Sequence, residues 1–126
     1  MTVVVDASAL LALMNDEPGA LIVREALYEA VISTVNLAEV VSKLVDGGVP
    51  EAQIFNDLGE WDLSGVPLDV QQAYAMGLLR AATRSFGLSL GDRACLSLAL
   101  QLSSPVITTD RAWAELDLGV EVRLAR

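Results

Sequence analysis

The chain opens with Thr2-Val3-Val4-Val5-Asp6, a run of β-branched, mainly apolar side chains that ends at a carboxylate. The run has no polar alternation, which is typical of a strand buried on both faces of a parallel sheet. Residues 7–14 follow with a composition rich in Ala and Leu, which predicts a helix. A buried strand that passes directly into a helix is the first unit of an α/β fold, and Asp6 lies at the junction.

Short apolar strands and helices alternate along the rest of the chain. Further strands are predicted over residues 30–33, 61–68, 106–108 and 120–124. Further helices are predicted over residues 19–29, 35–45, 50–58, 69–85, 91–102 and 111–116. This order predicts an α/β domain with a mainly parallel sheet and helices on both faces. In such sheets a ligand site lies beyond the carboxyl ends of the strands, where Asp6 and Asp110 are predicted to stand.

The composition excludes several classes of chemistry. The chain has 126 residues, which indicates one domain, and it contains no histidine and one cysteine, Cys95. Without an imidazole, Ser-His-Asp and Cys-His catalysis and histidine-ligated zinc are excluded. A lone cysteine excludes an internal disulfide, a thiolate zinc site and an iron–sulfur cluster, so we expect a cytoplasmic protein.

The charge of the chain is uneven. Residues 1–63 carry 11 acidic and two basic residues, which accounts for the net charge of −9. Residues 64–126 carry six acidic residues and six arginines. An acidic chain repels nucleic acid, so an RNA substrate requires a local basic surface, which these arginines would supply. The longest uncharged stretch, residues 94–109, contains polar residues and a proline, so no membrane partner is expected.

Three enzyme signatures can be set aside. The stretch 87–91 fits the G-x-S-x-G pattern of a hydrolase elbow, but a helix is predicted before it and no histidine base exists, so Ser89 or a neighbour is expected to cap the next helix. A phospho-receiver domain needs a second acid beside Asp6, where Ala7 stands, and a lysine after Lys43. A dehalogenase-type phosphatase needs an aspartate where Ser8 stands.

Four carboxylates remain at positions that suit a divalent-metal site, and each also has an ordinary structural interpretation. Asp6 and Asp110 follow strands and can cap the next helix. Glu39 precedes Lys43 by four residues, the spacing of a helix-surface ion pair. Asp92 lies in the first turn of a helix, where the macrodipole favours an acid. No single position decides between the two interpretations.

Four motifs in order resemble those of a PIN domain, and within that family those of the VapC toxins of toxin–antitoxin pairs. They are Val3-Val4-Val5-Asp6-Ala7-Ser8, Asn36-Leu37-Ala38-Glu39-Val40, Leu88-Ser89-Leu90-Gly91-Asp92-Arg93-Ala94-Cys95-Leu96 and Val106-Ile107-Thr108-Thr109-Asp110 with Trp113 close behind. The resemblance implies a single PIN domain over residues 1–126. Its fold would be a three-layer α/β/α sandwich with a central, mainly parallel sheet of about five strands.

The resemblance also implies an activity. The acidic quartet would fall on Asp6, Glu39, Asp92 and Asp110, supported by Thr108, and would hold Mg²⁺ or Mn²⁺ for endoribonuclease chemistry. Oxygen-only ligands suit these ions, and a metal-bound water replaces the missing histidine base. The expected RNA-contacting residues are Arg80, Arg84, Arg93 and Arg111.

The expected partners are a cognate VapB-type antitoxin, an RNA substrate (tRNA or ribosomal RNA) and a second copy of the chain in a homodimer. Apolar residues of the first half would line an antitoxin groove or a dimer face, unless they belong to the core: Leu10, Leu11, Leu13, Leu44, Val45 and Phe55. The alternative is an inactive PIN-type domain that only binds a partner or RNA.

Overall fold

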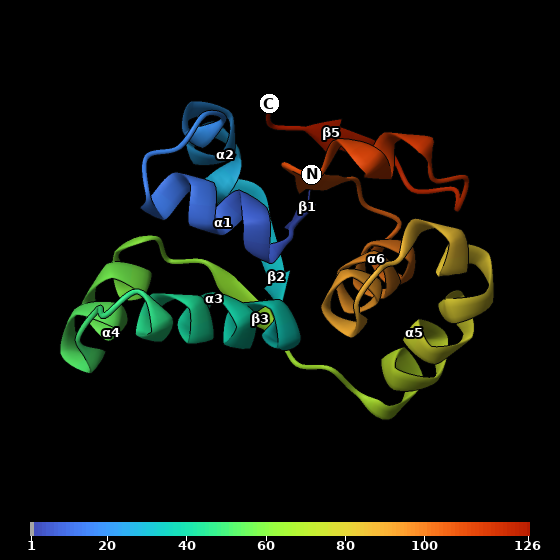
Figure 1. Cartoon of the computed structure of the whole chain (residues 1–126), viewed down its shortest axis with the longest axis horizontal. Helices are drawn as coiled ribbons and strands as arrows, with labels where there is room; N and C mark the ends of the chain where they lie inside the picture. The colour runs from blue at the N-terminus through green and yellow to red at the C-terminus, as the bar shows by residue number, and fades with distance from the viewer. Residues whose placement is uncertain (1) are drawn as a thin grey trace.

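The opening valines form strand β1 (Val3–Val5), the central strand of the sheet, and all three side chains are fully buried. The computed structural model describes residues 2–126, and within them five parallel strands lie in the order β3-β2-β1-β4-β5 (Figure 1). The other strands are β2 (Ala30–Ser33), β3 (Ser64–Val66), β4 (Val106–Thr108) and β5 (Val122–Leu124). The predicted α/β fold with a mainly parallel sheet is confirmed, and the sheet is parallel throughout.

Helices cover both faces of this sheet. They are α1 (Ala7–Met14), α2 (Ala20–Ala26), α3 (Thr34–Asp46), α4 (Glu51–Glu60), α5 (Val70–Thr83) and α6 (Leu90–Leu102). Three short 3-10 helices are η1 (Leu27–Glu29), η2 (Arg84–Phe86) and η3 (Arg111–Glu115). None of the helices in residues 2–126 has the length and apolar character needed to cross a lipid bilayer.

The three layers follow from the alternation of side chains in β1. Val3 and Val5 pack in one apolar cluster with α1 to α4, whereas Val4 packs in a second cluster with Cys95 and Leu96 of α6. Figure 1 accordingly shows α1 to α4 on one side of the strands and α5 and α6 on the other. This is the three-layer sandwich that the resemblance implied.

Most differences from the predicted elements lie at their ends. The predicted helix over residues 69–85 ends as α5 at Thr83 and continues as η2, because Gly87 adopts a left-handed conformation (φ 64°) that stops it. The element predicted over 111–116 is a 3-10 helix of five residues. Ser89 caps α6, and η2 rather than a strand precedes it, so the rejection of a hydrolase elbow is confirmed.

Candidate functional site

The strand order places one candidate site at the centre of the sheet. The chain passes from β1 to β2 on one side of the sheet and returns to β4 on the other, so a topological switch point lies between β1 and β4. Val5 pairs with Ile107 in this register, which brings Asp6 and the end of β4 to the same sheet edge. Crevices at such switch points are where open α/β sheets bind ligands.

Asp6 is buried at this edge and carries a dense set of hydrogen bonds. Its Oδ1 accepts from the Ala9 amide (2.8 Å) and the Ser8 hydroxyl (2.8 Å), and its Oδ2 accepts from the Thr108 hydroxyl (2.6 Å). Burial raises the pKa of Asp6 from its ordinary 3.8 to about 6, although these hydrogen bonds act to lower it, and the charge of Asp92 adds to the rise. Asp6 therefore caps α1, and burial at this position disfavours the ionised form of its carboxyl group.

Thr108 and Ser8 connect Asp6 to the loop after β4. The Thr108 hydroxyl oxygen accepts from the Asp110 amide (3.1 Å), and the Ser8 hydroxyl oxygen accepts from the Thr109 amide (3.1 Å). Asp110 caps η3 through a hydrogen bond from the Ala112 amide to its Oδ1 (3.0 Å). The loop after β4 is thus tied to the start of α1 by side chains on both segments.

Glu39 and Asp92 reach the same region from α3 and α6. Asp92 forms a capping box with Ser89, in which its Oδ2 accepts from the Ser89 amide (3.0 Å). The Oε1 of Glu39 accepts from the Asn36 side-chain amide (2.8 Å). Glu39 and Lys43 form no ion pair, so the helix-surface pair considered from their spacing is absent.

All four predicted acids line one pocket of about 300 Å³: Asp6, Glu39, Asp92 and Asp110. Its wall also includes six polar or charged residues that were not predicted to belong to the site: Ser8, Glu17, Asn36, Lys43, Thr109 and Arg126. Ser8 and Asn36 lie inside quoted motifs and were within reach of a prediction. Lys43 has the spacing of an ion pair with Glu39, which does not point to the pocket, and nothing local to Arg126 links this residue to a site at the first strand.

The ligand atoms of the pocket suit a hard divalent cation, but the arrangement of its acidic side chains suits one only in part. Its acidic side chains offer oxygen ligands alone, which Mg²⁺ and Mn²⁺ prefer. Among residues 2–126, however, no group of three or more Asp, Glu or Cys side chains is arranged so that it could hold an ion. The caps explain this, because hydrogen bonds hold one oxygen each of Asp92 and Asp110 toward their own helix ends.

The four arginines predicted to contact RNA lie outside this pocket. Arg93 is buried between α5 and α6, where its Nη1 donates to the Met76 carbonyl (3.1 Å), so it contributes to helix packing. Arg80 and Arg84 are exposed on α5 and η2. Arg111 is exposed, and its Nε donates to the Arg126 carbonyl (3.3 Å), which places it beside the pocket wall.

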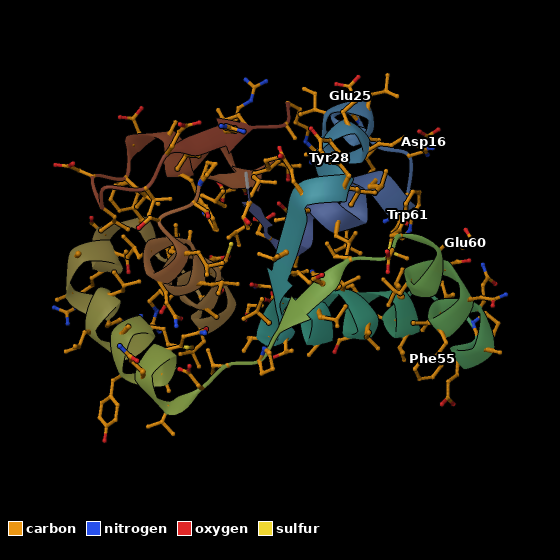
Figure 2. The ribbon with its side chains drawn as sticks, turned by 180° about the vertical axis from the view of Figure 1, so that it is seen from behind. Asp16, Glu25, Tyr28, Phe55, Glu60 and Trp61 are labelled. Carbon is orange, nitrogen blue, oxygen red and sulfur yellow. The ribbon has the colours of Figure 1, made fainter. Side chains whose placement is uncertain are left out.

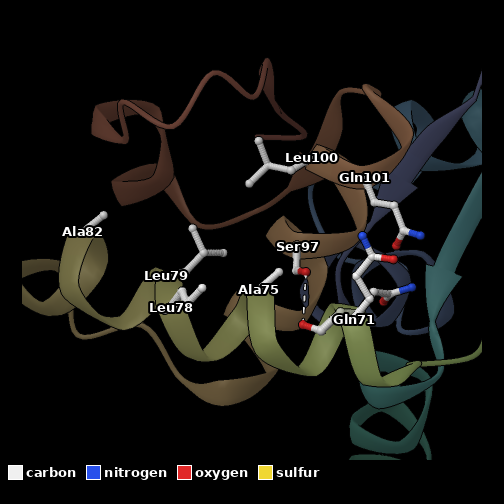
Figure 3. A pocket seen from close by; sticks show the side chains of 9 residues that line it. Gln71, Ala75, Leu78, Leu79, Ala82, Ser97, Leu100 and Gln101 are labelled. Carbon is white, nitrogen blue, oxygen red and sulfur yellow. Dashed lines mark hydrogen bonds between the residues drawn. The ribbon is translucent and has the colours of Figure 1, made fainter.

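Two further cavities are apolar. A groove of about 750 Å³ runs between α1, α3 and α4 and includes three of the six predicted apolar residues, Leu10, Val45 and Phe55. Leu13 and Leu44 are buried in the core instead, and Leu11 packs against it. Figure 2 shows Phe55 pointing outward from α4 at the molecular edge. A cavity of about 470 Å³ lies between α5 and α6, and Figure 3 shows glutamine and leucine side chains and Ser97 along it.

Comparisons with known proteins agree with this architecture. Solved structures with similar folds include a chain of the DNA-bound VapBC of Salmonella typhimurium (TM-score 0.77, 17% identity, 100% of this chain and 99% of that chain). A toxin–antitoxin complex from Klebsiella pneumoniae (0.74, 19%, 99% and 98%) and VapBC-5 of Mycobacterium tuberculosis (0.63, 23%, 100% and 99%) are also similar.

At these identities the likeness establishes the fold. No curated protein sequence matches the chain. The family model of the PIN domain matches residues 3–118, almost the whole length. The chain therefore belongs to the PIN domain family.

Proposed function

We propose that this chain is a metal-dependent endoribonuclease and the toxin of a VapBC-type toxin–antitoxin pair. One observation carries the proposal: four carboxylates from four separate segments line one pocket at the switch point of a PIN fold. The PIN fold is typical of nucleases, and the similar solved structures come from complexes named toxin–antitoxin or VapBC. We place its action in the cytoplasm, where cellular RNA is accessible.

The proposed ligands of Mg²⁺ or Mn²⁺ are Asp6, Asp92 and Asp110, with Glu39 holding the ion or its water. When bound, the cation supplies a water of lowered pKa as the nucleophile for phosphodiester hydrolysis. The second oxygens of Asp92 and Asp110 carry no hydrogen bond within residues 2–126, so they would be available to an ion. Thr108 and Ser8 hold Asp6 in place.

RNA must approach an acidic pocket, and two cations in its wall suit this task. Lys43 and Arg126 line the pocket with exposed side chains, and Arg111 lies beside Arg126. We propose that these residues hold phosphates next to the acidic quartet. Arg80 and Arg84 would extend this contact along α5, whereas the buried Arg93 is left to its packing role.

The apolar groove between α1, α3 and α4 is the proposed seat of a VapB-type antitoxin. Residues 44–63, which supply most of the groove's lining, carry five acidic residues and no basic one, so acids predominate around the groove, and Arg24 lies over the Trp61 ring (5.3 Å to its centroid). An amphipathic segment with basic flanks would match it in both apolar contact and charge. Homodimer formation is a separate part of the proposal.

The test is cleavage of total cellular RNA by the purified chain with Mg²⁺, Mn²⁺ or EDTA, beside Asp92→Asn. We expect discrete products that require the metal and fall by orders of magnitude in the variant, which should fold as the wild type does. Retained cleavage by Asp92→Asn would overturn the assignment of the site. Sequencing the product ends would decide between tRNA and ribosomal RNA.

An inactive PIN domain that binds RNA or a partner is the alternative. The presence of all four acids in one pocket favours the enzyme. No cleavage by folded, Mn²⁺-loaded protein, together with RNA binding by the same sample, would favour the alternative.

A further inference from the structure

Asn36 makes two hydrogen bonds beside the acidic pocket, one to Glu39 within α3 and one that joins α3 to α6. Its side chain is almost fully buried, and its Nδ2 donates to the Glu39 Oε1 (2.8 Å) and to the Gly91 carbonyl (2.9 Å). Both partners only accept hydrogen bonds, so the amide can satisfy them in one orientation only, with its nitrogen toward them. Its buried Oδ1 is left without a hydrogen-bond partner among residues 2–126, which is energetically unfavourable.

Gly91 provides the space that Glu39 occupies. A Cβ atom added at Gly91 would lie 1.9 Å from the Glu39 Oε1 and 2.5 Å from its Cδ. The carboxylate of Glu39 therefore lies directly on the backbone of α6, one residue before Asp92. An alanine at position 91 would displace the end of this flexible side chain rather than any backbone atom.

We propose that Asn36 is a positioning residue that holds the Glu39 carboxylate over Gly91 and directs it into the pocket. This inference rests on the proposed function, since Glu39 is there an ion- or water-holding residue. Glu39 needs a group that holds it because Asp6 and Asp92 face the same pocket. Repulsion between these like charges would otherwise drive the Glu39 side chain toward solvent. Asn36 supplies a neutral donor that opposes this without adding a charge.

Three variants test the proposal. Asn36→Leu keeps the branched shape of the side chain and removes the donor. Gly91→Ala displaces Glu39 while leaving Asn36 in place. Gly77→Ala is the matched control, because Gly77 is also a helical glycine and a Cβ there meets nothing within 4 Å. The readouts are Mn²⁺ affinity by calorimetry, thermal unfolding in EDTA, and RNA cleavage, with Asn36→Leu also measured in a Glu39→Ala background.

We expect Asn36→Leu and Gly91→Ala each to weaken Mn²⁺ binding by about 10-fold or more, the usual effect of losing a group that orients a metal ligand. Gly77→Ala should bind as the wild type does. Gly91→Ala should unfold at or above the wild-type temperature, since alanine favours the helix. In the Glu39→Ala background, Asn36→Leu should have no further effect on Mn²⁺ affinity.

Each other outcome has a defined meaning. A persistent effect of Asn36→Leu without Glu39 would make Asn36 merely structural and overturn the proposal. Wild-type Mn²⁺ affinity in Gly91→Ala would overturn it even if Asn36→Leu failed to fold. A wild-type protein that neither binds Mn²⁺ nor cleaves RNA would overturn the proposed function and this inference together, whereas active wild type with unaffected variants would overturn this inference alone.

Discussion

In the metal-free protein, the free energy of unfolding of Asp6→Asn should rise relative to that of the wild type as the pH rises. Asp6 has a pKa of about 6 in the fold against an ordinary 3.8, so the folded state binds the Asp6 proton more tightly than the unfolded state does. The stability that this proton provides is lost as the pH rises from about 4 through 6. Above that range the ionised carboxylate costs about 3 kcal/mol, the 2.2-unit shift at 1.36 kcal/mol per unit.

The pH dependence gives the cleanest measurement, because the hydrogen bonds that asparagine loses or keeps do not change with pH. Between about pH 5 and pH 7.5, the free energy of unfolding of Asp6→Asn should rise by about 1.5 kcal/mol relative to the wild type. Urea unfolding in EDTA, followed by fluorescence of the buried Trp113, measures it. The same substitution at the exposed Asp117 controls for the loss of one negative charge.

A difference between Asp6→Asn and the wild type that stays constant over this pH range would refute the reasoning. A fall in the free energy of unfolding of Asp6→Asn relative to the wild type as the pH rises would do so more strongly, because it would mean that the carboxylate is stabilised by its surroundings. Burial, the largest cause of the raised pKa, would then be outweighed by the hydrogen bonds from Thr108, Ala9 and Ser8.

Three further predictions concern other parts of the site. Thr108→Val removes a donor to Asp6 and should lower the free energy of unfolding by about 1–3 kcal/mol, whereas Thr108→Ser keeps the donor and, losing only a buried methyl group, should lower it less; equal stability of the two in urea would contradict this. Burial and the nearby acids raise the pKa of the Cys95 thiol well above its usual range, so a disulfide reagent should label it only in urea, and rapid labelling of the folded protein would contradict its burial. Lys43→Gln in the Asp92→Asn background should weaken RNA binding and reduce the salt slope by about one, which fluorescence anisotropy measures; Arg123→Gln, which removes a cation paired with Glu121, is the control, and an unchanged slope would argue against phosphate contact by Lys43.

The fold was predictable because local signals agreed along most of the chain. The uniformly apolar Val3–Val5 run requires burial on both faces, and a strand with that requirement lies at the centre of a parallel sheet. The helix starts at Asp69 and Ser89 were also predictable, since short polar side chains before an apolar run cap helices. The end of α5 was less predictable, because the change to a 3-10 turn depends on the left-handed conformation of Gly87.

The candidate site was predictable in its acids and in Thr108, which donates to Asp6. Strand ends and helix positions mark Asp6, Glu39, Asp92 and Asp110, and the topology brings them to one pocket. The surrounding cations were not predictable, because their places depend on how distant segments pack. Arg93, adjacent to Asp92 in sequence, points into the α5–α6 interface, while Arg126 reaches the pocket from the far end of the chain.

The structural and functional interpretations of the acids prove compatible in this fold. Asp6 and Asp110 cap helices, and Asp92 completes the capping box of α6, so each accepts a hydrogen bond from a backbone amide and leaves its carboxylate at the pocket wall. A helix start carries partial positive charge and stabilises a nearby anion. Three helix starts directed at one pocket therefore offset part of the repulsion between its carboxylates before any cation is bound.

Glu39 lies within α3 rather than at a helix start, so it depends instead on the Asn36 amide. That difference explains why a buried asparagine lies beside this acid. It is also why we expect the removal of Asn36 to weaken Mn²⁺ binding through Glu39.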